Sequence, residues 1–235
     1  GMPSTVELWA GGFAAELEDD ADGIANACRR ISKNPLGSAA GYGTPGIPVD
    51  REHTSAALGF DTVHSPVTAV QLSRGKAEAN LVFELCMLMQ DLGKLASDLL
   101  LYYTQEFAFI RLPENMTTGS SIMPQKRNPD VLELVRGATA TINASLVEIL
   151  GITTKLSSGY QRDLQRLKPP LFRAIDLAGA SAEIMAHLVS GVEFIAENIE
   201  LDDAIFAAEQ ANKLVVEKGI SFRDAYLQVA RDLKA

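Results

Sequence analysis

A heptad pattern of apolar residues between Lys76 and Phe107 constrains the fold of this chain more than any other feature. One apolar stripe advances by alternating steps of four and three residues, at Leu81, Leu85, Leu88, Leu92, Leu95, Leu99 and Tyr102. A second stripe runs beside it, at Val82, Cys86, Met89, Gly93, Ala96, Leu100 and Tyr103. Such spacing is typical of an α-helix with two apolar faces. The pattern therefore predicts a long helix inside a helical bundle.

Only a thin polar line remains on this helix, at Glu84, Asp91, Asp98 and Gln105. Two apolar stripes are more surface than a single chain of 235 residues is expected to cover. We therefore expect the stripes to serve both the core and an interface between copies of the chain, which predicts a homo-oligomer.

Five further segments are expected to be helical, and several of their ends carry local signals. Asn128 is expected to cap a helix that begins at Pro129, because proline suits the first helical position. Gly219 after Lys218 signals a helix end, and Ser221 is expected to cap the last helix. The expected helices cover residues 6–31, 129–152, 170–199, 202–217 and 222–233.

These segments predict an all-α fold: a central bundle of long helices followed by a small helical C-terminal region. The later helices are shorter and more acidic, so a boundary is expected near Ala180, with residues 1–180 in the bundle and residues 181–235 in the small region. Long non-helical stretches are expected at residues 34–50, 111–128 and 157–170. Long loops in a compact helical protein are often functional.

Charge and composition exclude several classes of protein. The net charge is −9, whereas a nucleic-acid-binding protein needs a clustered basic face. No uncharged apolar run is long enough to span a bilayer, and no signal-peptide pattern is present, so a cytoplasmic protein is expected. Cys28 and Cys86 lie far apart in apolar helical surroundings, which favours two buried free thiols over a metal site.

The stretch TTGSSIMPQKRNPDVLEL, residues 117–134, is dense in hydroxyl, amide and cationic groups. Ser120 and Ser121 supply hydroxyls, Lys126 and Arg127 supply positive charge, and the following helix offers free N–H groups. Together these groups suit a carboxylate or a phosphate. The loop has no P-loop pattern and no nearby histidine for a Ser-His pair. By composition alone, a polar surface loop ahead of a capped helix fits equally well.

The order of residues in GSSIMPQKRNP resembles the signature loop of the fumarase/aspartase superfamily, lyases that release fumarate by β-elimination. Gln125 stands where fumarases and aspartases have Gly and adenylosuccinate lyases have Tyr, so the resemblance is to the argininosuccinate lyase family. NPLGSAAGYG, GYQRDLQRLKPPLF and LVVEKGISFRDAY are similar to the same family. The resemblance extends over about residues 34–230.

The resemblance implies cleavage of argininosuccinate to arginine and fumarate, a step of arginine biosynthesis, without a metal or an organic cofactor. Ser120 would be the general base that removes a proton next to a substrate carboxylate. Lys126 and backbone N–H groups would stabilise its alkoxide. Lys126 and Asn128 would bind the carboxylates of the fumarate end, and Glu133 would orient a catalytic histidine.

Five more residues are implied at the substrate site. Ser121 and Gln125 would contact the substrate from the signature loop. Tyr160, Gln165 and Lys168 match positions that contact the amino-acid part of argininosuccinate. In this family each active site is built by loops from different subunits of a tetramer, so a homotetramer is implied.

The chain also departs from the family pattern. It has no Thr-His motif, and none of its three histidines lies in such a context. VTAVQLSRG stands where an Asp-Arg-Asp cluster is expected, and Arg166-Leu167 replaces an acidic pair. The chain is therefore expected to be a fragment that lacks the N-terminal domain of the family and is inactive alone.

Three alternatives stay open. Leu167 and VTAVQLSRG leave room for another lyase of the superfamily, such as an adenylosuccinate lyase or a cycloisomerase. A truncated helical scaffold, or a crystallin-like structural relative, would have the fold without the activity. The third alternative is a helical interaction module that happens to carry the loop motif.

Overall fold

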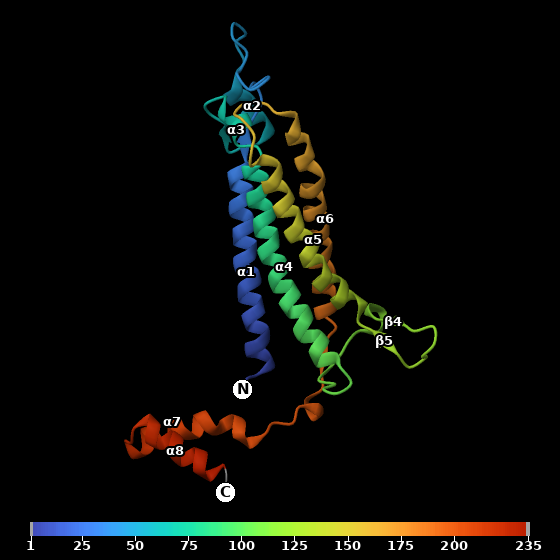
Figure 1. The fold of residues 1–235 in the computed structure, drawn as a ribbon, viewed down its shortest axis with the longest axis vertical. Coiled ribbons are helices and arrows are strands. Elements are labelled where there is room, and N and C mark those ends of the chain that lie inside the picture. Colours follow the sequence, from blue (N-terminus) through green and yellow to red (C-terminus); the bar gives the residue numbers. More distant parts are fainter. Residues whose placement is uncertain (1, 234–235) are drawn as a thin grey trace.

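Four long helices form the body of the computed structural model, which describes residues 2–233. They are α1 (Val6–Ile31), α4 (Lys76–Tyr103), α5 (Asp130–Thr153) and α6 (Lys168–Val189), and they run side by side along the long axis of the molecule (Figure 1). α4 packs against each of the other three. The predicted all-α bundle is confirmed.

The two apolar stripes of α4 lie in the core of this bundle. All their members are buried or half-buried, and Val82 and Met89 are fully shielded. Because α1, α5 and α6 of the same chain cover the stripes, the expectation that they exceed what one chain can cover is wrong. Large exposed apolar side chains lie on α5 and α6 instead, among them Leu134 at 72%, Val147 at 69% and Phe172 at 56% exposure.

The polar line of α4 faces α1. Trp9 on α1 donates from Nε1 to Asp98 Oδ2 at 2.8 Å. Further along the seam, Asp20 of α1 is only 7% exposed, and within the described chain its Oδ2 has no hydrogen-bond partner. Burial raises the pKa of Asp20 to about 6, and nearby carboxylates, of which Asp91 has the largest effect and Glu84 a smaller one, contribute to the increase. The α1–α4 seam therefore encloses a carboxyl group whose ionised form is disfavoured in the folded chain.

Several helix ends follow the signals in the sequence. α1 has the predicted bounds. α7 (Ala207–Lys218) ends at Gly219, which has a φ of +62°. α8 (Phe222–Asp232) begins where Ser221 Oγ accepts the N–H of Asp224 at 3.2 Å. These local signals predicted the C-terminal elements correctly, although a short 3₁₀ turn, Asp203–Phe206, precedes α7.

α4 is shorter than predicted, because it ends at Tyr103 and not at Phe107. Ala108 adopts a φ of +46°, which reverses the chain direction. The N–H of Phe109 then donates to the carbonyl oxygen of Tyr102 at 2.9 Å. The reversal brings the ring centroids of Phe107 and Phe109 to 5.2 Å, so aromatic packing replaces the last predicted turn.

The predicted helix at residues 170–199 is also wrong at its end. α6 ends at Val189, and the chain continues into β6 (Glu193–Phe194), which pairs antiparallel with β3 (Ile110–Arg111). Gly191, between α6 and β6, lies so close to Pro113 that a Cβ on it would be 2.5 Å from the proline Cγ. A contact with a segment about 80 residues earlier thus ends the helix, followed by a 3₁₀ turn at residues 196–198.

A small cap closes the end of the bundle where α4 begins, and no helix was predicted in it. It contains α2 (Arg51–Leu58), α3 (Ala69–Leu72) and a parallel pair of two-residue strands, β1 (Lys33–Asn34) and β2 (Thr62–Val63). The completely buried Asn34 side chain donates from Nδ2 to the first carbonyl oxygen of α2 at 3.0 Å. This contact ties the glycine-rich loop that follows β1 to the cap.

α7 and α8 pair with each other away from the four-helix bundle (Figure 1). They have a small core of their own, made of Ala211, Ala225 and Val229. Ala180, where a boundary was predicted, lies within the uninterrupted helix α6. We propose that the C-terminal unit begins near Asp202, since the chain ahead of it still pairs with β3.

The two cysteines differ in burial. Cys86 is buried on α4, which raises the pKa of its thiol, whereas Cys28 is exposed. The prediction of two buried thiols is therefore wrong for Cys28, which lies on the outer side of the last turns of α1. Across residues 2–233, no helix has the length and apolar character to cross a membrane.

Gly75 gives a test of the junction between α4 and α5. It has a φ of +84°, and a Cβ at this position would be 2.1 Å from Thr153 Cγ2. We expect Gly75→Ala to lower the free energy of unfolding by about 2–4 kcal/mol, as measured by urea denaturation. Gly46→Ala is the matched control, since Gly46 has a φ of +79° but open space around it. Equal losses in the two variants would show that only backbone strain matters.

Asp20 predicts a pH-dependent stability. Its carboxyl loses its proton near pH 4 in the unfolded chain and near pH 6 in the folded chain, so the folded state becomes less favourable as pH rises through that window. Asp20→Asn is expected to raise the free energy of unfolding by about 1–2 kcal/mol above pH 6 and to have little effect below pH 4. Asp22→Asn, an exposed change on the same helix, is the control. A gain that is the same at pH 4 and pH 8 would contradict the charge explanation.

Candidate active site

The hydroxyl-rich loop forms a β-hairpin at the N-terminal end of α5. β4 (Thr118–Gly119) and β5 (Arg127–Asn128) pair antiparallel, with Thr118 opposite Asn128. The hairpin projects sideways from the bundle (Figure 1). Its base is fixed by two contacts: Arg127 Nη2 pairs with Glu114 Oε1 at 2.8 Å, and the Thr118 hydroxyl donates to the Asp130 carboxylate.

Ser120 lies half-buried just after β4. Its Oγ accepts two backbone hydrogen bonds, from the N–H groups of Ile122 and Met123, each at 3.2 Å. Both donors come from the tip of the same hairpin, so the hairpin itself shapes this environment. Two backbone donors aimed at one oxygen stabilise negative charge on it. Ser120 Oγ is thus placed where an alkoxide would be held by main-chain dipoles.

Asn128 has a different role from the predicted helix cap. It lies in β5, and its Nδ2 donates to the carbonyl oxygen of Gly119 at 3.4 Å, across the hairpin. Pro129 occupies the N-cap position of α5, and no side chain caps that helix. The prediction of Asn128 as N-cap is therefore wrong, because strand pairing places its amide against the opposite strand.

An open groove of about 1,010 Å³ lies between the hairpin and the ends of α4 and α5. Gln125 lines it, whereas Ser120 and Asn128 do not. In the part of the chain that the structure describes, no carboxylate lines this groove. Its basic lining residues are Arg111, Lys126, Arg127 and Arg136. The groove therefore suits an anionic molecule that approaches the hairpin.

Sequence reasoning missed two of these cations. Arg136 lies seven residues after Pro129, which is about two helical turns along the same face of α5. Its spacing in the sequence could therefore have indicated that it faces the loop. Arg111 lies in β3, which pairs with β6, and it lines the groove together with Ile195, the residue that follows β6. No local pattern in the sequence points to that pairing.

The remaining residues predicted on this side are exposed. Ser121 lies at the hairpin tip, and Glu133 lies in the first turn of α5. Within residues 2–233, no ion pair or hydrogen bond joins Glu133 to a histidine, and no group of three or more His, Cys, Asp or Glu could hold a metal ion. The hairpin side thus contains a candidate base but no histidine in contact with Glu133.

Tyr160, Gln165 and Lys168 form a second group of exposed residues. Gln165 lies in a 3₁₀ helix, η2 (Arg162–Leu167), and Lys168 is the first residue of α6. Gln165 Nε2 donates to Tyr160 Oη at 3.5 Å. The structure therefore brings two of the three predicted amino-acid contacts together, ahead of α6.

The hairpin group and the Tyr160 group lie at opposite ends of α5. This helix has 24 residues, so it spans about 36 Å at 1.5 Å per residue. Figure 1 shows the hairpin and the start of α6 at opposite ends of the bundle. A substrate of ordinary size would touch both groups only where two chains meet.

Comparison with known proteins places this chain among lyases. Argininosuccinate lyase from Phocaeicola vulgatus is 41% identical to it, over 100% of this chain and 52% of the relative. A double variant of EDDS lyase with bound fumarate is 30% identical, with a TM-score of 0.82 over 90% of this chain and 42% of that one. Class II fumarase from Schistosoma mansoni shares the fold, with a TM-score of 0.81, 17% identity and coverage of 100% and 53%. The chain spans about half the length of the curated relatives it matches.

A family model described as "Lyase" matches residues 1–143, which is more than half of the chain. The similarity to argininosuccinate lyases extends over the remaining residues as well. The hairpin sequence, the long-helix bundle and these matches agree, and the chain belongs to the lyase family of the fumarase/aspartase superfamily.

Proposed function

We propose that this chain supplies the general base of a carbon-nitrogen lyase that cleaves argininosuccinate to arginine and fumarate. The observation that supports this most is the pair of backbone N–H groups on Ser120 Oγ. A serine is a poor base unless its alkoxide is stabilised, and main-chain donors provide that stabilisation without any change in protonation.

The proposed reaction is a β-elimination. Ser120 Oγ takes the proton from the carbon next to a substrate carboxylate, and the electron pair passes onto that carboxylate. The pair then forms the double bond of fumarate as the C–N bond breaks, and the departing nitrogen of arginine takes a proton from a general acid. Lys126 and Asn128, on either side of Arg127, hold the carboxylates on which negative charge accumulates.

The amine half of the substrate is assigned to Tyr160, Gln165 and Lys168 of another copy of the chain. This assignment follows from the length of α5, which separates these residues from the hairpin. The exposed apolar side chains on α5 and α6 provide surface for such an assembly. We propose a homotetramer in which Glu133 orients a histidine supplied by another part of the assembly.

A second candidate is a lyase that releases fumarate from a different amine. The similarity to EDDS lyase, at 30% identity, supports this alternative, because that lyase is named for a substrate other than argininosuccinate. The hairpin chemistry would be the same, and only the group bound near Tyr160 would differ. Fumarate release from adenylosuccinate, but not from argininosuccinate, would move the proposal to that related activity.

The role of Ser120 is tested in the natural polypeptide that contains these residues, with fumarate followed by its ultraviolet absorbance. Ser120→Ala is expected to lower kcat by about 10²–10⁴-fold with little change in KM, because the base acts in the chemical step. Ser121→Ala, which removes a proposed substrate contact and not the base, is the neighbouring control and is expected to raise KM while kcat falls far less than in Ser120→Ala. Equal losses in the two variants would contradict the assignment of Ser120 as the base.

The sharing of sites between chains is tested by mixing variants. Ser120→Ala and Gln165→Ala are each expected to be nearly inactive alone. Co-expressed chains should regain activity, because some hybrid sites would take Ser120 from one chain and Gln165 from another, both intact. A mixture of Ser120→Ala with Lys126→Ala, two changes in one hairpin, should regain none. Failure of the first mixture would show that Ser120 and Gln165 of the same chain form one site.

A further inference from the structure

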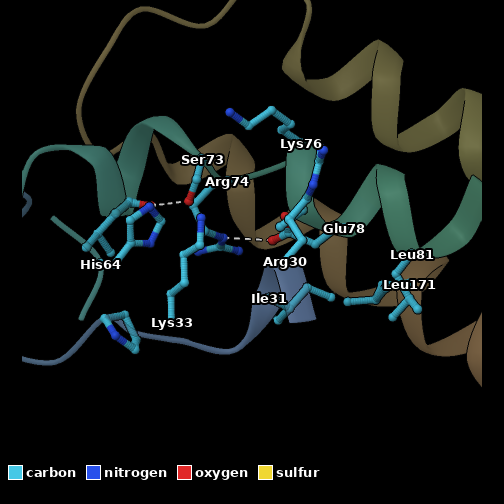
Figure 2. A pocket seen from close by; sticks show the side chains of 13 residues that line it. Arg30, Ile31, Lys33, His64, Ser73, Arg74, Lys76, Glu78, Leu81 and Leu171 are labelled. Atoms are coloured by element: carbon cyan, nitrogen blue, oxygen red, sulfur yellow. Dashed lines mark hydrogen bonds and ion pairs between the residues drawn. The ribbon is translucent and has the colours of Figure 1, made fainter. Parts of the chain in front are cut away.

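A second pocket lies at the other end of the bundle, away from the hairpin. It has a volume of about 380 Å³ and is formed by the end of α1, the junction of α3 and α4, and α6. Figure 2 shows the side chains of Ile31, Leu81 and Leu171 gathered at one side of it. Its basic lining residues are Arg30, Lys33, His64, Arg74 and Lys76. The pocket thus combines an apolar wall with concentrated positive charge.

The positive charge of this pocket is not neutralised by the residues that line it. Glu78 is the only acidic one among them, and both of its oxygens are engaged. Glu78 Oε1 accepts from Arg74 Nε at 2.8 Å, and Oε2 accepts from the Gly75 N–H at 2.6 Å. Within residues 2–233, the other three cations, Arg30, Lys33 and Lys76, form no ion pair.

His64 lines the pocket beside several positively charged side chains. Burial lowers the pKa of its imidazole, and the positive charges of Lys33, Arg51 and Lys76 lower it further. Lys33 and Lys76 line the pocket from β1 and the start of α4, and Arg51 of α2 donates from Nη2 to the carbonyl oxygen of His64 at 2.9 Å. An anion at this position would be attracted by several positive charges at once.

We propose that this pocket binds a small organic anion with at least two negative charges and an apolar portion, such as a phosphate ester or an aromatic dicarboxylate. The three cations that form no ion pair within residues 2–233 match the charge, and the wall of Ile31, Leu81 and Leu171 matches the apolar portion. The volume lies within the range of about 300–1,000 Å³ that is usual for small-molecule sites.

The pocket is physically joined to the segment that carries Gln165. Arg74 Nη2 donates to the carbonyl oxygen of Leu164 in η2 at 3.5 Å, and Leu171 lies one turn after Lys168 on α6. An anion that draws Arg74 into the pocket weakens its contact with Leu164. The anion then acts as an effector of the amine-binding group, a consequence that rests on the proposed function, whereas the binding itself does not.

Binding is tested on the 235-residue chain at low ionic strength, with phenyl phosphate, phthalate and inorganic phosphate as probes. Proton NMR resolves the imidazole signals of His64 and His187, and the latter lies on α6 outside the pocket. Phenyl phosphate or phthalate should shift the His64 signal in a saturable way and leave His187 unchanged. Tighter binding of phenyl phosphate would identify a phosphate ester as the ligand class, and tighter binding of phthalate would identify a dicarboxylate. If inorganic phosphate binds as tightly as phenyl phosphate, the proposal that the ligand needs an apolar portion is contradicted.

Matched variants locate the charge that binds. The Lys33→Gln and Lys76→Gln double variant should raise the dissociation constant by at least about tenfold for whichever of phenyl phosphate and phthalate binds the parent chain. Lys218→Gln, which changes an exposed residue at the end of α7, should stay within about twofold of the parent chain. Circular dichroism confirms that each variant is folded. No saturable shift of His64, or an equal loss in Lys218→Gln, would overturn the proposal whether or not the chain belongs to an active lyase.

Discussion

The burial of α4 between α1, α5 and α6 is the packing constraint on which the rest of this structure depends. Both of its apolar stripes are buried within one chain, and large apolar side chains on α5 and α6 stay exposed outside this core. Because helices fill the middle, polar loops collect at the two ends. The hairpin occupies one end, and the cap with the cationic pocket occupies the other.

The α1–α4 seam is packed differently from the rest of the core. Here the polar line of α4 meets a helix that brings further carboxylates, and Asp20 is enclosed without a partner for Oδ2 within the described chain. The hydrogen bond from Trp9 to Asp98 and the contact of Trp9 with Tyr102 of α4, at 5.7 Å between ring centroids, hold the other end of the seam. α1 is therefore anchored by aromatic packing at its start and opposed by charge near its middle.

The sequence predicted what depends on local spacing and missed what depends on distant contacts. The heptads of α4, the bounds of α1 and the Gly219 stop are periodic or local features, and they were predicted correctly. The early end of α6 comes from the pairing of β6 with β3, which no local pattern indicates. The ordered loop motif selected the candidate residues of the hairpin, but it did not indicate that the loop is a hairpin or that Arg111 lines its groove.

The length of α5 fixes both the distance and the relative rotation between the hairpin before it and the segment that leads to α6. One residue added within it would lengthen it by about 1.5 Å and turn one end by about 100° relative to the other. In the proposed assembly that error would appear at every site simultaneously. Changes in length between relatives should therefore collect in the loops before and after α5, while the number of residues from Asp130 to Thr153 stays constant.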